Sequence, residues 1–130
     1  MIGDGPVRPV GLGSNAVLRF STPSDPGNTW AGSDWGGGKV LWAVAPDLAA
    51  SVVISGRQLD GPGSVRFGQA LVPDEQLVLP AAPAGASDTS GLDGWRSFPT
   101  AVRVQHEGCY GYQIETPTRS YTIVFSAARS

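Results

Sequence analysis

The sequence predicts an all-β protein with an immunoglobulin-like antiparallel β-sandwich of about seven to nine short strands. Three observations lead to this fold class. Apolar and polar side chains alternate from residue 16 to the end, which is the two-residue period of strands with one buried face. The chain has 18 Gly and 11 Pro but only 15% charged residues, a composition that suits short strands and tight turns. Segment 108–114 has Gly, then Tyr two residues on, as at the corner before the penultimate strand of such sandwiches.

The predicted strands follow one another along the chain. Each is marked by apolar side chains at every second position, and no segment shows the apolar period of a ten-residue helix. A two-layer sandwich is the economical arrangement for them, and a barrel is the alternative. The predicted strands are at 16–20, 40–44, 52–54, 65–67, 77–79, 102–105, 110–115 and 121–125.

Two stretches interrupt this rhythm, at 21–38 and at 80–94. Both are rich in Gly, Pro and small polar residues, so we expect long loops there. Residues 1–130 are expected to form a single domain, because the 36 residues after Gly94 are too few for a core of their own. Loops of this length commonly carry function, which makes them the first place to seek a site.

Composition argues against several partners. The net charge is −2 and the nine Lys and Arg residues are scattered singly, whereas nucleic acid requires a basic face. The longest apolar run, 40–45, is far shorter than the ~20 residues of a transmembrane helix, so no transmembrane segment is predicted. With one cysteine, Cys109, an internal disulfide is excluded.

Three tryptophans, Trp30, Trp35 and Trp95, lie in or beside the glycine-rich loops. Exposed loop aromatics are typical platforms for sugars or peptides, so these three are the candidate ligand-binding residues. The alternative interpretation is that their rings cover the open ends of the sandwich and plug its core.

Four other residues are expected to have structural roles. Trp42, Tyr110 and Tyr121 lie on the apolar faces of predicted strands or at the corner, and Tyr110 is expected to hydrogen-bond to backbone across it. Cys109 is predicted to be a buried, inert thiol, because cysteine is among the most buried residue types.

The sequence predicts no enzyme, no cofactor and no metal. His106 and Cys109 suggest a cupredoxin, but a blue-copper site needs two His and an axial ligand, and the chain has one His and only Met1. Gly36-Gly37-Gly38-Lys39 fails the P-loop pattern and is interpreted as a flexible entry to a strand. No Gly-x-Ser-x-Gly occurs, which disfavours a hydrolase. The oxygen-rich segment 88–93 lacks the EF-hand ladder of calcium ligands and is interpreted as a turn.

Two segments carry a family resemblance. Val53-Ile54-Ser55-Gly56-Arg57-Gln58-Leu59-Asp60 and the pair Gly94-Trp95-Arg96-Ser97-Phe98-Pro99 and Gly108-Cys109-Tyr110 resemble the signatures of uncharacterised bacterial exported proteins and lipoproteins. The resemblance spans roughly 28–127 and implies an extracytoplasmic location, secreted or lipid-anchored, without implying an activity or ligand. A cytoplasmic location is the alternative, because the first residues lack the pattern of a signal peptide.

The sequence thus predicts a non-catalytic extracytoplasmic interaction or structural module whose partner is an unknown protein or a cell-surface glycan. A carbohydrate-binding module that uses the loop tryptophans is the alternative. A cupredoxin-like or hydrolytic protein is disfavoured.

Overall fold

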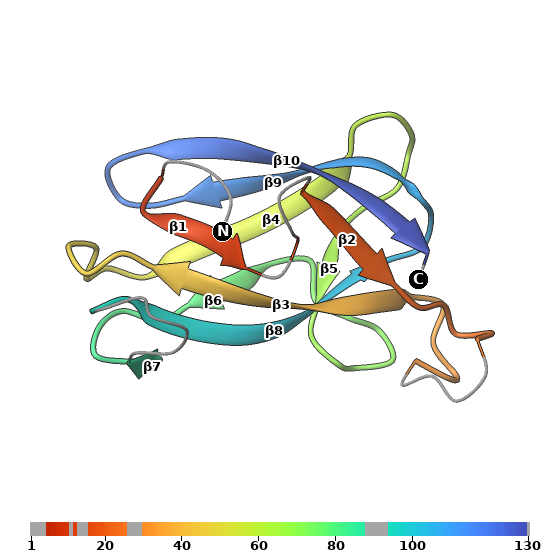
Figure 1. Ribbon diagram of the computed structural model, residues 1–130, viewed down its shortest axis with the longest axis horizontal. Coiled ribbons are helices and arrows are strands. Elements are labelled where there is room, and N and C mark those ends of the chain that lie inside the picture. The colour runs from red at the N-terminus through yellow and green to blue at the C-terminus, as the bar shows by residue number, and fades with distance from the viewer. Residues whose placement is uncertain (1–4, 11, 13–15, 26–29, 88–93, 130) are drawn as a thin grey trace.

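The computed structural model describes residues 5–10, 12, 16–25, 30–87 and 94–129. Within these ranges the chain forms ten strands and no helix. They stack in two layers, seen in Figure 1 with β9 and β10 above and β3 and β8 below. The strands are β1 (Val7–Val10), β2 (Val17–Phe20), β3 (Gly36–Val44), β4 (Val52–Gln58), β5 (Arg66–Phe67), β6 (Leu77–Leu79), β7 (Ala86–Ser87), β8 (Arg96–Val104), β9 (Gly108–Glu115) and β10 (Ser120–Arg129).

The strand order confirms the predicted immunoglobulin-like sandwich. One sheet has the order β1-β3-β8-β5, with β7 also paired to β8, and the other has the order β2-β10-β9-β4-β6. The first order corresponds to the A-B-E-D sheet of immunoglobulin domains, and β10-β9-β4 corresponds to G-F-C. Pairs are antiparallel except that β2 runs parallel to β10, which the sequence did not indicate.

Strand β1 was missed by the alternation argument. It lies at the edge of its sheet, with Pro9 opposite Trp42 of β3. Proline is tolerated on an edge strand, because one side of such a strand makes no ladder hydrogen bonds. Because Pro9 interrupts the strand pattern in the sequence, β1 was not predicted, although its Val7 is fully buried.

One hydrophobic core lies between the sheets, as the period of two predicts. Tyr112 is at its centre: its ring lies 4.8 Å from the ring of Trp42, edge to face, and 4.1 Å from that of Phe125, stacked. Burial raises the pKa of the Tyr112 hydroxyl well above its ordinary value. The buried core side chains include Leu18, Phe20, Val40, Trp42, Val44, Val52, Ile54, Phe67, Leu79, Val102, Val104, Tyr110, Tyr112, Ile114, Ile123 and Phe125.

Two tyrosines fasten the strands as expected of corner residues. Tyr110 is fully buried and its hydroxyl donates a 2.7 Å hydrogen bond to the carbonyl of His106, four residues upstream. Tyr121 is half-buried, donates to the carbonyl of Val7 at 2.6 Å and accepts from the Val7 amide at 3.0 Å. Tyr121 thereby joins β10 of one sheet to β1 of the other.

The expected burial of Cys109 is wrong. Cys109 is half-buried, because it alternates with the inward-facing Tyr110 and so lies on the outer face of the sheet. Its backbone amide donates to Oδ1 of Asp60 at 3.0 Å. His106, at the corner itself, is exposed.

The glycine run that opens β3 is not a flexible entry but a place of close approach. A Cβ atom on Gly37 would lie 2.9 Å from Cδ of Arg103, and one on Gly38 would lie 2.6 Å from the carbonyl oxygen of Arg19. Glycine here lets β3 pack against β2 of the opposite sheet and lets Arg103 cross the outer face.

Candidate functional site

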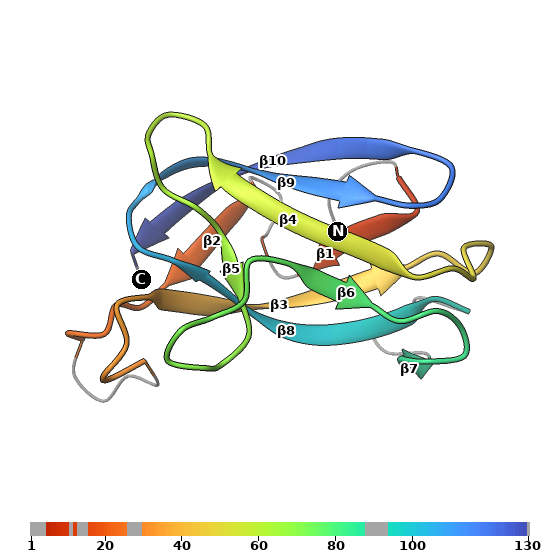
Figure 2. The ribbon, with the colours of Figure 1, turned by 180° about the vertical axis from the view of Figure 1, so that it is seen from behind.

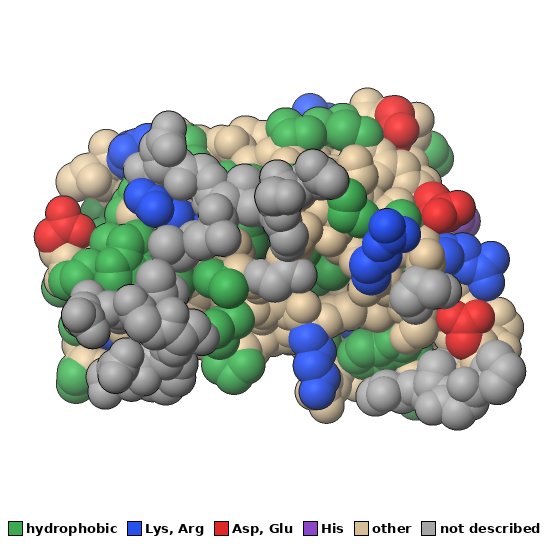
Figure 3. Space-filling view, in the orientation of Figure 1, with side chains coloured by type: hydrophobic (Ala, Val, Ile, Leu, Met, Phe, Trp, Pro, Cys, Tyr) green, Lys and Arg blue, Asp and Glu red, His purple; other side chains and the backbone are tan. Residues whose placement is uncertain are grey.

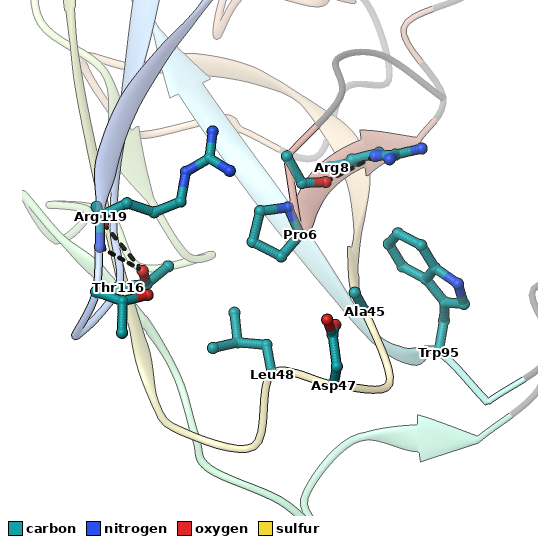
Figure 4. A pocket seen from close by; sticks show the side chains of 10 residues that line it. Pro6, Arg8, Ala45, Asp47, Leu48, Trp95, Thr116 and Arg119 are labelled. Carbon is teal, nitrogen blue, oxygen red and sulfur yellow. Dashed lines mark hydrogen bonds between the residues drawn. The ribbon is translucent and has the colours of Figure 1, made fainter.

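A pocket of about 420 Å³ opens at one end of the sandwich, where the β3–β4 loop, the β9–β10 turn and the starts of β1 and β8 meet (Figure 4). We call it the Trp95 pocket. Figure 3 shows both basic and acidic side chains on the surface at this end, on the left. Its lining residues are Gly5, Pro6, Arg8, Ala45, Asp47, Leu48, Trp95, Thr116, Thr118 and Arg119.

Two arginines form opposite walls of the Trp95 pocket. The Nε of Arg8 donates to the carbonyl of Gly5 at 2.8 Å, and its guanidinium carbon lies 5.1 Å from the centre of the Trp95 ring. The guanidinium carbon of Arg119 lies 4.8 Å from the centre of the Tyr121 ring. Neither guanidinium forms an ion pair within the described ranges. Within those ranges their terminal nitrogens have no carboxylate partner.

The turn that bears Arg119 is braced by Thr116. The Thr116 hydroxyl donates to the carbonyl of Arg119 at 3.0 Å and accepts from its amide at 3.2 Å. A backbone hydrogen bond of 2.9 Å from the Thr116 amide to the same carbonyl closes the turn. Arg119 thus projects from a fixed base.

Asp47 supplies the one carboxylate found among the described lining residues. It is exposed and follows β3, and Figure 4 shows it between Arg119 on one side and Trp95 on the other. With two guanidiniums, one carboxylate, two threonine hydroxyls and an indole, the lining holds many hydrogen-bonding groups. Among the described residues of the lining there is no imidazole and no thiol.

The three candidate tryptophans are not brought together. Trp95 precedes β8, whereas Trp30 and Trp35 contact Arg103 near the other end of that strand, about 25 Å away at the ordinary strand rise. Trp30 is 6% exposed and donates from Nε1 to the carbonyl of Gly37 at 3.2 Å, so its ring is no sugar platform. Trp35 is half-buried, with the guanidinium of Arg66 at 5.1 Å from its ring centre. Of the three, Trp95 lines a pocket.

Arg103 is the most informative residue that sequence reasoning missed. Its position between Val102 and Val104 indicates a solvent-facing side chain, yet it is fully buried on the outer face of its sheet beneath two loops. All its donors are used, and burial lowers the pKa of its guanidinium below the ordinary value. Its hydrogen bonds run from Nε to Gly36 O (3.0 Å), from one terminal nitrogen to Gly68 O (3.0 Å) and Ala70 O (2.8 Å), and from the other to Ser33 Oγ (3.0 Å) and Trp35 O (2.8 Å).

The other sequence candidates do not assemble into a site. In the part of the chain that the structure describes, no three His, Cys, Asp or Glu side chains gather in a way that would hold a metal ion. The oxygen-rich segment 88–93 lies outside the described residues.

No helix in the described ranges is long and apolar enough to span a membrane.

Comparison with known proteins adds one structure. No family model matches the sequence, and no curated protein matches it. Among solved structures, the chain is similar to the ASH/PapD-like domain of human CEP192 (PapD-like domain 7), with 12% identity and a TM-score of 0.42. That alignment covers 99% of this chain and 89% of the other. The fold assignment given above depends on the strand order of this chain alone.

Proposed function

We propose that the chain is a non-catalytic β-sandwich module that works outside the cytoplasm and binds an acidic glycan in the Trp95 pocket. The observation that carries the proposal is the pair of guanidiniums, Arg8 and Arg119, on opposite walls of one pocket. Each is placed by an aromatic ring, and neither has an ion-pair partner among the described residues. A guanidinium favours carboxylate, to which it donates two parallel hydrogen bonds.

The remaining lining favours a sugar over a peptide terminus as the bearer of that carboxylate. Asp47 offers acceptor oxygens in the same lining, and Thr118 adds a hydroxyl, which suits neighbouring hydroxyls of a sugar ring. The half-exposed indole of Trp95 offers apolar surface at the same place. A chain of uronic acids carries carboxylates and hydroxyls on successive rings, whereas a peptide end carries a single carboxylate.

A binding role is favoured over hydrolysis by the count of acids. Glycoside hydrolysis ordinarily requires two carboxyl groups on either side of the scissile bond, and among the described residues the pocket lining contains one, that of Asp47. The extracytoplasmic location is supported by the resemblance of segments 53–60, 94–99 and 108–110 to exported proteins.

Isothermal titration with a galacturonic acid oligomer tests the proposal, with the neutral galactose oligomer of equal length as the paired probe. The acidic oligomer should bind, and Arg8→Gln and Arg119→Gln should each raise its dissociation constant by about tenfold or more, equivalent to ~1.4 kcal/mol. Arg19→Gln is the matched control, because Arg19 is an exposed arginine on β2, remote from the pocket lining. Added salt should weaken binding.

Three outcomes would overturn the proposal. Equal affinity for the neutral oligomer would remove the charge argument. Preference for a short peptide with a free carboxyl end over both oligomers, lost when that end is amidated, would make the partner a protein. Absence of binding to either oligomer, in a variant set whose unfolding is unchanged, would leave the pocket without its assigned ligand class.

A further inference from the structure

Two consecutive apolar side chains are exposed on the outer face of the sheet that contains β3 and β8. Leu71 is 62% exposed and Val72 is 75% exposed, at the tip of the loop between β5 and β6. Figure 2 shows this loop projecting below β8, on the side away from β9 and β10. Single exposed apolar residues are ordinary on a protein surface, but an adjoining pair on a projection is a candidate contact. We call Leu71 and Val72 the knob.

The knob is held in one conformation by hydrogen bonds on both sides of it. Arg103 donates to the carbonyls of Gly68 and Ala70, and the Ser33 hydroxyl donates to the carbonyl of Leu71 at 2.6 Å. At the base of the loop, the amides and carbonyls of Phe67 and Asp74 exchange two hydrogen bonds of 2.8 Å. A surface fixed in advance loses little conformational entropy on binding, which favours association.

A mainly apolar groove of about 450 Å³ adjoins the knob on the same face. The ladder register places its floor, because Val10 pairs with Leu41 and Leu41 pairs with Pro99 across three neighbouring strands. Lys39 and Ala101 form the next row, and the remaining lining residues are Val40, Gln69 and Thr100. Since Gln69 stands two residues before Leu71, the groove and the knob are neighbours.

The charges beside the knob and the groove are complementary. Lys39 lies in the groove and Asp74 at the base of the knob loop, both exposed. Within the described ranges neither side chain forms an ion pair. A knob and a groove side by side on one face allow two copies related by a twofold axis to fill each other's groove at once. That arrangement would also set Asp74 of each copy near Lys39 of the other.

We propose that this face is a docking surface for a second copy of the chain, with the knob of each copy seated in the groove of the other. A second copy is the occupant because one chain has, side by side, a knob, a groove and opposite charges, Lys39 and Asp74, that form no ion pair with any described residue. The surface is separate from the Trp95 pocket, which lies at the end of the sandwich. Dimerisation would present two pockets to one glycan and raise its apparent affinity through multivalency.

Sedimentation velocity of the whole chain, from about 1 µM to about 1 mM, tests the proposal. The mass should rise from the 13.5 kDa of one chain towards twice that value. Leu71→Asp should raise the dimer dissociation constant by at least about tenfold, and so should Val72→Asp. Val124→Asp is the matched control, because Val124 is 53% exposed on β10 in the other sheet and should leave the constant unchanged.

Charge reversal separates specific docking from general stickiness. Lys39→Glu should weaken the dimer, Asp74→Lys should weaken it likewise, and the two changes together should restore it. A chain that stays monomeric at the highest concentration would overturn the proposal. The proposal would also be overturned if Val124→Asp weakened the dimer as much as the knob variants do. It would be overturned likewise if the charge-reversed double variant dimerised no more tightly than either single variant. Thermal unfolding of each variant identifies those that remain folded. One folded variant of Leu71 or Val72 is sufficient to test the contribution of the knob.

Discussion

The guanidinium carbon of Arg103 lies 4.2 Å from the centre of the Trp30 ring, and both side chains are buried on the outer face of a sheet. A cation stacked on an indole and surrounded by neutral acceptors is an unusual way to hold two loops, because burial of a charge is costly unless every donor is used. Here every donor is used, so the contact fixes the segments 33–36 and 68–70 to β8.

Arg103→Met is expected to lower the free energy of unfolding by about 2 to 4 kcal/mol, since an acceptor left buried and unpaired costs ~1–3 kcal/mol and most of the five acceptors are only partly buried. The free energy of unfolding of Arg103→Lys should lie between those of the parent and Arg103→Met, because an ammonium has three donors where the guanidinium has five. Urea denaturation measures both. Arg19→Met, an exposed arginine, is the control, and an equal loss in that variant would assign the effect to charge in general.

Tyr110→Phe removes the hydroxyl that bonds to His106 and should cost about 0.5 to 1.5 kcal/mol. Tyr110→Ala removes the buried ring as well and should cost about 3 to 5 kcal/mol, as for other large aromatic truncations. Chemical denaturation of the pair separates the two contributions. A Phe variant as stable as the parent would show that the corner hydrogen bond contributes nothing.

Tyr112→Phe is expected to have the opposite sign. The Tyr112 hydroxyl is buried in the core, and no described residue accepts or donates a hydrogen bond to it. Removing an unsatisfied hydroxyl should raise the free energy of unfolding by about 0.5 to 2 kcal/mol. A destabilised Phe variant would mean that the hydroxyl has a partner, such as an internal water.

Asp60 predicts a dependence of stability on pH. The Cys109 amide and then the Gln58 side chain, both donating to its carboxylate, lower its pKa below the ordinary 3.8. A lowered folded-state pKa gives stability that is present above the unfolded-state value and is lost as the pH falls through the folded-state value. Asp60→Asn should therefore reduce the melting temperature at pH 7, and its melting temperature should converge with that of the parent as the pH falls from 3.8 to below the lowered pKa of the folded state. If the melting temperatures of variant and parent differed equally at both pH values, the loss of stability would be due to the shape of the side chain and not to its charge.

Cys109 should react with a thiol reagent in the native state. It lies half-buried on an outer face, so access is restricted but not blocked. Mass spectrometry after timed exposure should show labelling slower than in the denatured chain by about tenfold or less. Complete protection of the native thiol over hours would place the side chain in the interior.

How far the sequence predicts this structure depends on the range of the interactions involved. The alternation in 110–115 and the glycine before Tyr110 are local signals, and they were sufficient for β9 and its corner. The burial of Cys109 was misjudged through residue-type preference, although its alternation with Tyr110 already placed it outside. Arg103 was expected to be exposed because the loops that cover it are distant in sequence, and the local alternation of side chains carries no information about them.

The candidate site was predicted for one residue, Trp95. Its companions Arg8, Asp47 and Arg119 come from three other segments, and each is by itself an ordinary surface charge. Only the pairing of β1 with β3 and of β9 with β10 brings these segments to one end. No sequence pattern indicates that these four residues meet in space. Trp95 could be selected because an aromatic residue next to a glycine in a predicted loop is a local feature of the sequence.

Four of the five acceptors around Arg103 are main-chain carbonyls, and the fifth is the hydroxyl of Ser33. Arg103 therefore holds the segment 68–70 through main-chain carbonyls alone, whereas in the segment 30–36 it also contacts the side chains of Trp30 and Ser33. We therefore expect the loop to keep its course when residues 69–72 are exchanged for other sequences, provided that glycine remains at 68, where φ is +99°. A foreign recognition peptide grafted at these positions would be held by Arg103 through main-chain carbonyls.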